Sequence, residues 1–99
     1  MKFEVCTDSL AGANLAAKCG AHRIELCSGL TVGGLTPSYS ISAKCAQIIE
    51  THVMIRYREG DFCYDPAEVE LMANDIHQLA KWGIHGVVFG CLTIESNLD

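Results

Sequence analysis

Short apolar runs alternate with longer segments of helical periodicity along the whole chain. Four of the runs predict β-strands, at residues 3–6, 24–27, 53–56 and 87–90, because each is too short to form a helix. In the segments between them, apolar side chains recur every three or four positions, which is the spacing of one face of an α-helix. Strands that alternate with helices are typical of right-handed βαβ units, so the pattern predicts an α/β domain with a parallel sheet.

Capping residues predict where the three helices begin and end. We expect N-caps at Asp8, Thr36 and Asp65, and a capping box in which Asp65 pairs with Glu68. Prolines at the first helical position support the second and third helices, and glycines at 20 and 83 should end the first and third. The side chains expected on the buried faces are Leu10, Ala13 and Ala17, then Ile41, Cys45 and Ile48, then Val69, Met72, Ile76 and Leu79.

An internal sequence repeat supports this division of the chain into strands and helices. Residues 18–26 are matched by residues 81–89, at an offset of 63 residues. Two βα units of about 31 residues each would produce this offset. In both copies a helix ends at a glycine, and a histidine two positions later leads into an apolar strand. We expect His22 and His85 to have equivalent structural roles.

Charged residues inside the predicted strands favour a barrel over an open sheet. Periodicity alone leaves a doubly wound sheet and a TIM barrel equally open. Parallel strands covered by helices on both faces are normally apolar, yet Glu4, Glu25 and Arg56 interrupt three of these strands. Such side chains cannot face packed helices without a large desolvation cost, so they should line a polar interior.

Composition excludes several classes of partner. The formal net charge is −5 and no basic stripe is present, so binding to nucleic acid is not expected. No apolar run approaches the roughly 20 residues of a membrane span. Glu4 stands where a signal peptide would need its apolar stretch, so we expect a cytoplasmic protein.

Two of the six cysteines stand where a barrel would keep its site. Cys6 and Cys27 end adjacent predicted strands, at the face where TIM barrels carry their functional residues. Two neighbouring thiolates can hold one Cu(I) ion in a linear site, and Met54 could assist as a soft thioether. The alternative is that both cysteines are packed as small apolar residues.

Glu4, Glu25 and Arg56 form a second candidate constellation on the same face. Arg56 could neutralise both carboxylates, and Asp61 lies in the loop that follows the third strand. One interpretation is a pocket for a small polar or anionic substrate with an acid/base pair. The other is an internal ion-pair network without chemistry. No residue is assigned a catalytic role.

Six short motifs run in order along the chain: EVC-x-DS at 4–9, RIELCS at 23–28, GGLTPS at 33–38, VMIR at 53–56, GDFCY at 60–64 and GVVFG-x-LT at 86–93. Together these motifs resemble the copper-homeostasis CutC family. The resemblance implies a TIM barrel, a Cu(I)-binding role, and Cys6 with Cys27 as the copper ligands. Two features depart from the family pattern. Tyr57 and Glu59 replace its usual proline and glycine, and the match ends after the fourth strand, although such a barrel needs about 250 residues.

These observations together predict one incomplete TIM-barrel domain over residues 1–99, with three and a half to four βα units. The expected function is cytosolic copper homeostasis through Cu(I)–thiolate binding, with an enzymatic role less expected. The alternatives are a barrel enzyme acting on a small substrate, or an inactive shortened fragment. Because four parallel strands cannot close on themselves, we also expect self-association.

Overall fold

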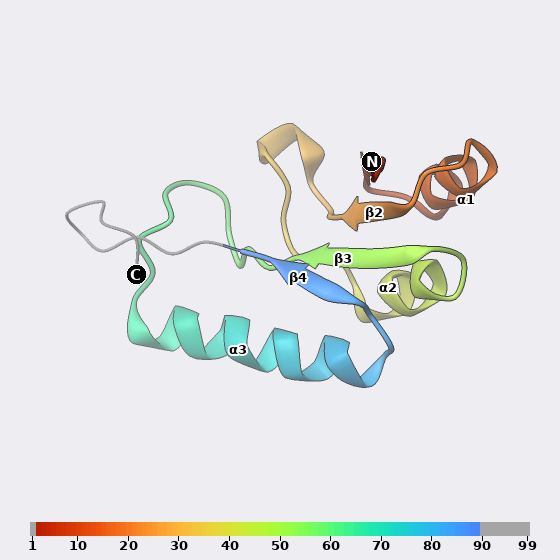
Figure 1. Ribbon diagram of the computed structural model, residues 1–99. Coiled ribbons are helices and arrows are strands. Elements are labelled where there is room, and N and C mark those ends of the chain that lie inside the picture. Colours follow the sequence, from red (N-terminus) through yellow and green to blue (C-terminus); the bar gives the residue numbers. More distant parts are fainter. Residues whose placement is uncertain (1, 90–99) are drawn as a thin grey trace.

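Four parallel strands form a single sheet in which sequence neighbours are also spatial neighbours (Figure 1). The structure, a computed structural model, describes residues 2–89. The strands are β1 (Glu4–Thr7), β2 (Arg23–Leu26), β3 (Glu50–Met54) and β4 (Gly86–Val88), in the order β1-β2-β3-β4. The predicted α/β class with a parallel sheet is confirmed.

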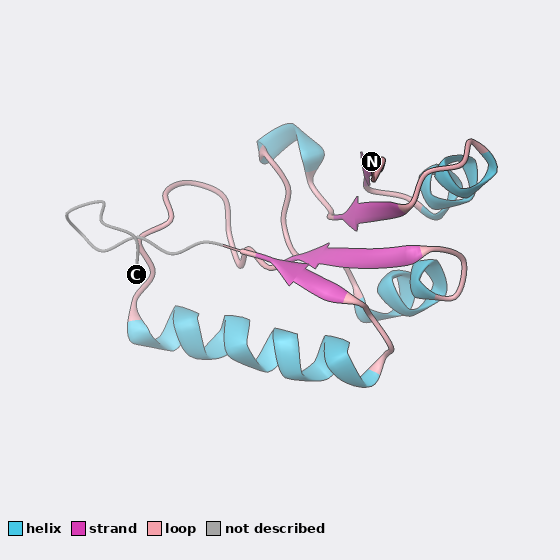
Figure 2. Cartoon of the chain, viewed as in Figure 1, coloured by secondary structure: helices cyan, strands magenta, loops and turns pink. Residues whose placement is uncertain are grey.

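Each connection between strands contains a helix (Figure 2). These are α1 (Leu10–Lys18), α2 (Tyr39–Ala46) and α3 (Pro66–Lys81), and a short 3₁₀ helix, η1 (Leu30–Val32), precedes α2. Figure 1 shows η1 and the loop between β3 and α3 arching beyond the carboxyl ends of the strands. In residues 2–89, no helix has both the length and the apolar character that crossing a bilayer would require.

All three helices pack against the same face of the sheet. Ile24 and Leu26 of β2 form one buried cluster with Ala13 and Ala16 of α1 and Cys45 of α2. Val53 of β3 and Ile55 just beyond it form a second cluster with Met72 and Leu79 of α3. Since side chains alternate along a strand, the residues between these apolar positions project from the opposite face. That opposite face carries the charged residues.

The N-caps of the first two helices lie beyond the predicted residues. Ser9, not Asp8, caps α1, because its Oγ accepts a hydrogen bond of 2.9 Å from the Gly12 N–H. Ser38, not Thr36, caps α2 and accepts from the Ile41 N–H. The Thr36 hydroxyl is engaged elsewhere, because it accepts from the Arg56 N–H at 2.8 Å.

The predicted capping box of α3 is confirmed. Asp65 accepts from the Glu68 N–H at 2.8 Å, and Glu68 accepts from the Asp65 N–H at 3.1 Å. Three side chains expected on buried helix faces are instead exposed: Ala17, Ile48 and Val69.

Strand three was predicted three residues too late, and this shift changes the role of Arg56. The strand ends at Met54, so Arg56 follows it and belongs to the loop rather than to the ladder. The three other strands lie within a residue or two of their predicted starts, although position 90 at the predicted end of the fourth lies outside the described residues.

The repeat predicted from the sequence is present in the structure. Gly20 and Gly83 end their helices with φ values of +83° and +84°, a left-handed conformation that favours glycine. After each glycine, a histidine binds the preceding strand in the same way. His22 Nδ1 accepts from the Phe3 N–H at 2.7 Å, and His85 Nδ1 accepts from the Thr51 N–H at 3.0 Å. Each imidazole therefore links the residues just before a new strand to the start of the preceding strand.

His85→Ala should destabilise the protein by about 1–2 kcal/mol, because it leaves the N–H of buried Thr51 without an acceptor. His85→Asn should recover part of this loss, since an amide oxygen can take the place of Nδ1. His77→Ala, on the exposed surface of α3, serves as the control and should change the free energy of unfolding by less than about 0.5 kcal/mol. Urea denaturation measures all three, and equal effects at positions 77 and 85 would contradict the proposed role of His85.

Candidate functional site

On the face of the sheet opposite the helices, a row of ion pairs lies at the amino ends of the strands. Arg23 lies opposite Glu4 on one side and Glu50 on the other in the strand register. Its Nε is 2.6 Å from Glu4 Oε2, and its Nη1 is 4.0 Å from Glu50 Oε2. His52 Nε2 lies 2.9 Å from the same Glu50 oxygen. The hydrogen bond to His52, followed by nearby positive charges, holds the pKa of Glu50 below its usual value.

The predicted Glu4–Glu25–Arg56 network is therefore wrong. The arginine that pairs with Glu4 is Arg23, and Arg56 forms no ion pair with either glutamate within residues 2–89. Sequence reasoning missed Arg23 because it started the second strand one residue too late. Alternation along β2 would have placed Arg23 on the same face as Glu25.

Arg56 instead joins two loops at the carboxyl ends of the strands. Its Nη1 donates to the carbonyl oxygens of Val32 at 2.8 Å and Gly34 at 3.2 Å, and its Nη2 donates to that of Gly60 at 2.9 Å. The ring of Phe62 lies 5.0 Å from the guanidinium carbon, at cation–π distance. The residue is only 8% exposed, and its Nε–H is buried without an acceptor among the described residues. Arg56 thus fixes the loop before α2 against the loop after β3.

Cys6 and Cys27 lie on neighbouring strands at this end of the sheet. Cys27 follows β2 directly, is 2% exposed, and points its thiol at the Thr7 carbonyl, 3.7 Å away. Burial raises the pKa of the Cys27 thiol to about 11, with further contributions from the charge and hydrogen bonding of Cys6. In the strand register Cys6 pairs with Glu25, and Cys27 lies two residues beyond Glu25, so both side chains project from the same face of the sheet. Asp8 and Glu25 add smaller repulsions of the same sign.

The Met54 side chain also ends close to Cys27, and Gly34 lies over both. A Cβ atom at Gly34 would lie 3.5 Å from Cys27 Sγ and 3.7 Å from Met54 Cε. The thiol and the end of the thioether side chain therefore approach one point from β2 and β3. Gly34 has a φ of +98° and covers Cys27, while its carbonyl is held by Arg56. The loop that Arg56 anchors thus covers the Cys27 thiol.

Asp61 and two further cysteines, Cys19 and Cys45, have other surroundings. Asp61 is exposed and caps a turn, because its Oδ1 accepts from the Cys63 N–H at 3.1 Å and lies 3.3 Å from Arg58. Cys19 is exposed on the surface, and Cys45 belongs to the core. Position 91 lies outside the described residues. Across residues 2–89, no three His, Cys, Asp or Glu side chains gather closely enough to form a metal site.

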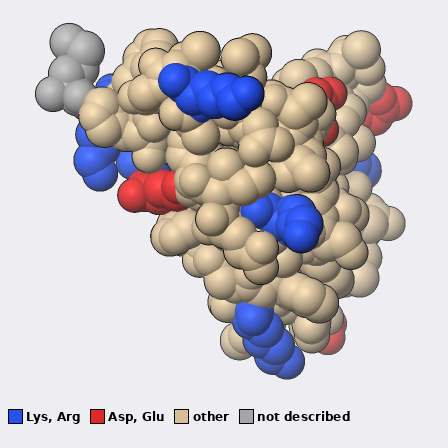
Figure 3. All heavy atoms as spheres, turned by 90° about the vertical axis from the view of Figure 1, so that its right-hand side faces the viewer, with Lys and Arg blue, Asp and Glu red and all other residues tan. Residues whose placement is uncertain are grey.

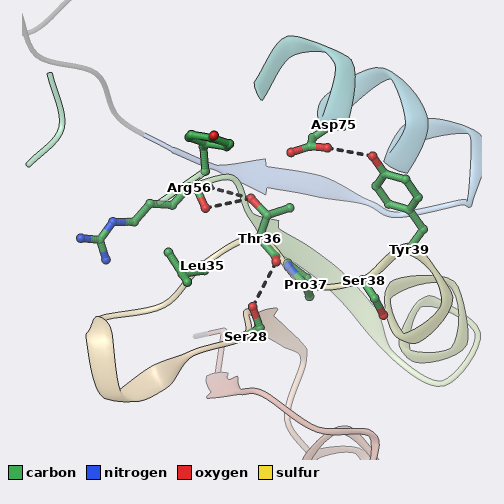
Figure 4. Close-up of a pocket in the computed structure, with 9 residues that line it drawn as sticks. Ser28, Leu35, Thr36, Pro37, Ser38, Tyr39, Arg56 and Asp75 are labelled. Atoms are coloured by element: carbon green, nitrogen blue, oxygen red, sulfur yellow. Dashed lines mark hydrogen bonds between the residues drawn. The ribbon is translucent and has the colours of Figure 1, made fainter. Parts of the chain in front are cut away.

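A cavity of about 460 Å³ opens between the loop that joins β2 to α2, the residues after β3, and α3 (Figure 4). Tyr39 and Asp75 meet at one side of it, with the Tyr39 hydroxyl donating to Asp75 Oδ1 at 2.7 Å. This bond is the main reason that the pKa of Tyr39 is raised. Figure 4 shows the Arg56 guanidinium pointing away from the other labelled side chains. Arg56 lines this cavity, but its guanidinium is bound to the loop carbonyls of Val32, Gly34 and Gly60.

Basic side chains do not form a continuous stripe on the face shown in Figure 3. Lysines and arginines stand there as separate patches with acidic side chains between and around them. This distribution, on a chain with a formal net charge of −5, offers no track for a phosphate backbone on that face.

The sequence profile of the CutC family matches residues 1–99. The chain belongs to the CutC family. Over 100 residues it is 47% identical to a CutC family protein of Bacteroides fragilis strain YCH46, covering 98% of this chain and 40% of that protein. A CutC family protein of Pasteurella multocida strain Pm70 is 44% identical over 101 residues. The chain thus spans about two fifths of the length of these curated CutC relatives.

A solved CutC structure shares the fold. The CutC protein of Streptococcus agalactiae, which carries the name of a copper homeostasis protein, superposes with a TM-score of 0.91 at 34% identity. The match covers 100% of this chain and 50% of that one. The three βα units and fourth strand described here therefore correspond to part of a larger CutC structure.

Arg56→Met should lower the free energy of unfolding by about 2–3 kcal/mol, because three loop carbonyls lose a charged donor. Arg56→Lys should not restore it, since an ammonium group cannot reproduce the planar fork of donors. Arg23→Met removes an exposed ion pair and should cost less than about 1 kcal/mol. Chemical denaturation compares the variants, and a larger loss for Arg23 than for Arg56 would contradict this assignment.

Proposed function

We propose that this chain binds Cu(I) through the thiols of Cys6 and Cys27 and acts in copper homeostasis. The observation that carries the proposal is the placement of these two side chains on the same face of neighbouring strands, since Cys6 pairs with Glu25 in the register and Cys27 lies two residues further along. The site lies at the carboxyl end of the strands, where TIM barrels keep their functional residues. The name of the Streptococcus agalactiae protein supports the same role.

The donor set suits Cu(I) better than other metals. Two thiolates satisfy a linear Cu(I) site, and Met54, whose terminal methyl lies under Gly34 beside Cys27, is the candidate for a third soft ligand. Structural zinc takes four ligands, and calcium or magnesium takes oxygen ligands. In the described part of the chain, no cluster of three His, Cys, Asp or Glu side chains offers such a set. Softness and low coordination number both favour Cu(I).

The environment of Cys27 determines how the ion would be held. With a pKa of about 11, the thiol carries its proton at neutral pH, so copper must displace that proton. Cys6 and Cys27 would hold the ion, and its positive charge would offset the repulsion that Cys6, Asp8 and Glu25 exert on a Cys27 thiolate. A buried thiolate that forms only with metal bound is suited to holding Cu(I) rather than to reacting with oxidants.

A cytoplasmic buffer or carrier is the role that these features fit. Thiols stay reduced in the cytosol, and a two-sulfur site with one exposed ligand, Cys6, permits exchange with other thiol ligands. The enzymatic alternative relied on Glu4 and Glu25 converging on Arg56 as an acid/base pocket. That group is not assembled within residues 2–89, since Arg56 binds loop carbonyls. Metal binding therefore has the stronger support.

The double variant Cys6→Ser with Cys27→Ser should abolish stoichiometric Cu(I) binding, because both thiolates are lost. Cys19→Ser should bind as the parent does, since Cys19 is exposed at the C-cap of α1 and is not on a strand. Cys45→Ser should also retain binding, although this residue lies in the core. Anaerobic titration against a chromophoric Cu(I) chelator, with the Cu(I)–thiolate absorbance as a second signal, measures the stoichiometry. Equal binding by the double variant and the parent would remove these two ligands from the proposal.

Binding of Cu(I) displaces one proton from the Cys27 thiol. Through Cys27 alone, Cu(I) affinity should therefore rise roughly tenfold per pH unit between pH 6 and 9. The sign follows from the raised pKa, because below about 11 the metal-free thiol is protonated and rising pH makes that proton easier to displace. The competition titration repeated across this range gives the slope. A pH-independent affinity would show that Cys27 is not a ligand.

A further inference from the structure

The cavity beside Tyr39 and Asp75 is built from three segments of the described chain. The loop from β2 to α2 forms one wall, the residues directly after β3 form the second, and α3 forms the third. Its volume of about 460 Å³ is in the range of small-molecule sites. Among the described residues, none of β1 or β4 lines it, and neither do Cys6, Cys27 and Met54. A ligand in this cavity is therefore distinct from the proposed copper ion and does not involve the edges of the sheet.

Most polar groups around the cavity are already hydrogen-bonded within the protein. The Ser28 hydroxyl donates to the Thr36 carbonyl at 3.0 Å, and the Thr36 hydroxyl is bonded to the backbone of Arg56. The Arg56 guanidinium is held by loop carbonyls, and Figure 4 shows it directed away from the other labelled side chains. The Ser38 hydroxyl caps α2. These groups fix the walls and leave little binding capacity for a ligand.

Asp75 is the charged group of the cavity that keeps such capacity. Its side chain is half-buried on α3, and it forms no ion pair within residues 2–89. Oδ1 accepts the hydrogen bond from the Tyr39 hydroxyl, and Oδ2 has no hydrogen-bond donor in this part of the chain. An ionised carboxylate accepts hydrogen bonds through both oxygens. A partly desolvated carboxylate without a cation is stabilised by one that binds beside it.

The other lining groups suit the remainder of an organic cation. Tyr39 and Tyr57 both line the cavity, and Tyr57 is 48% exposed. Aromatic rings attract ammonium groups through the negative charge of their faces. Leu35 and Pro37 add apolar surface against which a hydrocarbon body can pack. An anion would instead be repelled by Asp75, so the combination favours an organic cation.

We propose that this cavity binds a small primary ammonium compound with an apolar body, and that Asp75 is its charge partner. The Tyr39 hydroxyl holds Oδ1, so that Oδ2 receives the ligand. A primary ammonium group pairs with the charge of this oxygen and also donates a hydrogen bond to it, which strengthens the contact. The rings of Tyr39 and Tyr57 add cation–π attraction.

Three matched probes test the proposal on the 99-residue chain: phenethylammonium, phenethyl alcohol and hydrocinnamate. They share a phenyl ring and a short alkyl chain and differ in whether the polar end is positive, neutral or negative. Backbone amide chemical shifts, followed by NMR at neutral pH, report both affinity and location. The ammonium probe should bind roughly tenfold more tightly than the alcohol, because it alone makes a charged contact. Hydrocinnamate should bind most weakly, and the amides that shift should be those around the cavity.

Asp75→Asn removes the charge but keeps an oxygen for the Tyr39 hydroxyl, so the contact between α2 and α3 is retained. It should raise the dissociation constant of phenethylammonium roughly tenfold. Tyr57→Leu should raise it roughly threefold through the loss of a cation–π contact. Circular dichroism of both variants should match that of the parent.

Glu70→Gln is the matched control, because it removes the same charge from an exposed position of α3 outside the cavity. It should bind phenethylammonium as the parent does. The proposal is overturned if the ammonium probe does not bind saturably, or if the alcohol binds equally well. Shifts confined to another part of the chain would also overturn it, as would equal affinities of the Asp75→Asn and Glu70→Gln variants.

Discussion

The one-sided packing of the sheet is the constraint on which the rest of this structure depends. Alternation along β2 and β3 sends Ile24, Leu26 and Val53 to the helices and leaves the charged and sulfur-bearing residues on the other face. Burying that second face under helices would strand several charges away from water. The polar face therefore has to line an interior or face solvent. Both the ion pairs of Arg23 and the thiols of the proposed site are consequences of that division.

Local sequence signals predicted the elements well, because the forces behind them are local. Apolar periodicity located all four strands and three helices to within a few residues, and the Asp65 capping box was unambiguous. The N-caps of α1 and α2 were less predictable, since two candidate capping residues lie close together in each case. At α2, Thr36 and Ser38 have similar intrinsic preferences as caps. What decided between them was a hydrogen bond from the Arg56 backbone N–H, 20 positions along the chain, to the Thr36 hydroxyl.

The candidate site was only partly predictable for the same reason. Cys6 and Cys27 were recognisable because each lies at the end of an adjacent strand, which is a matter of position along the sequence. The contacts of Arg56 could not be predicted in this way, because they depend on where β3 ends and on the path of two glycine-containing loops. The approach of Gly34 to Cys27 and Met54 likewise arises from a loop folding back over the sheet. Side chains within one strand can be assigned to a face from sequence, whereas contacts between loops require the structure.

The proximity of Cys27 to β1 has a consequence for the order in which the molecule assembles. The thiol of Cys27 reaches the Thr7 carbonyl across a separation of 20 residues, and Gly34, which covers Cys27, follows only a few positions later. Closing loops of about this size takes well under a microsecond, far less than the pairing of distant strands. The contact between these two segments is therefore local in the chain and depends on neither β3 nor β4. During synthesis, a nascent chain could form this contact while most of the domain is still emerging.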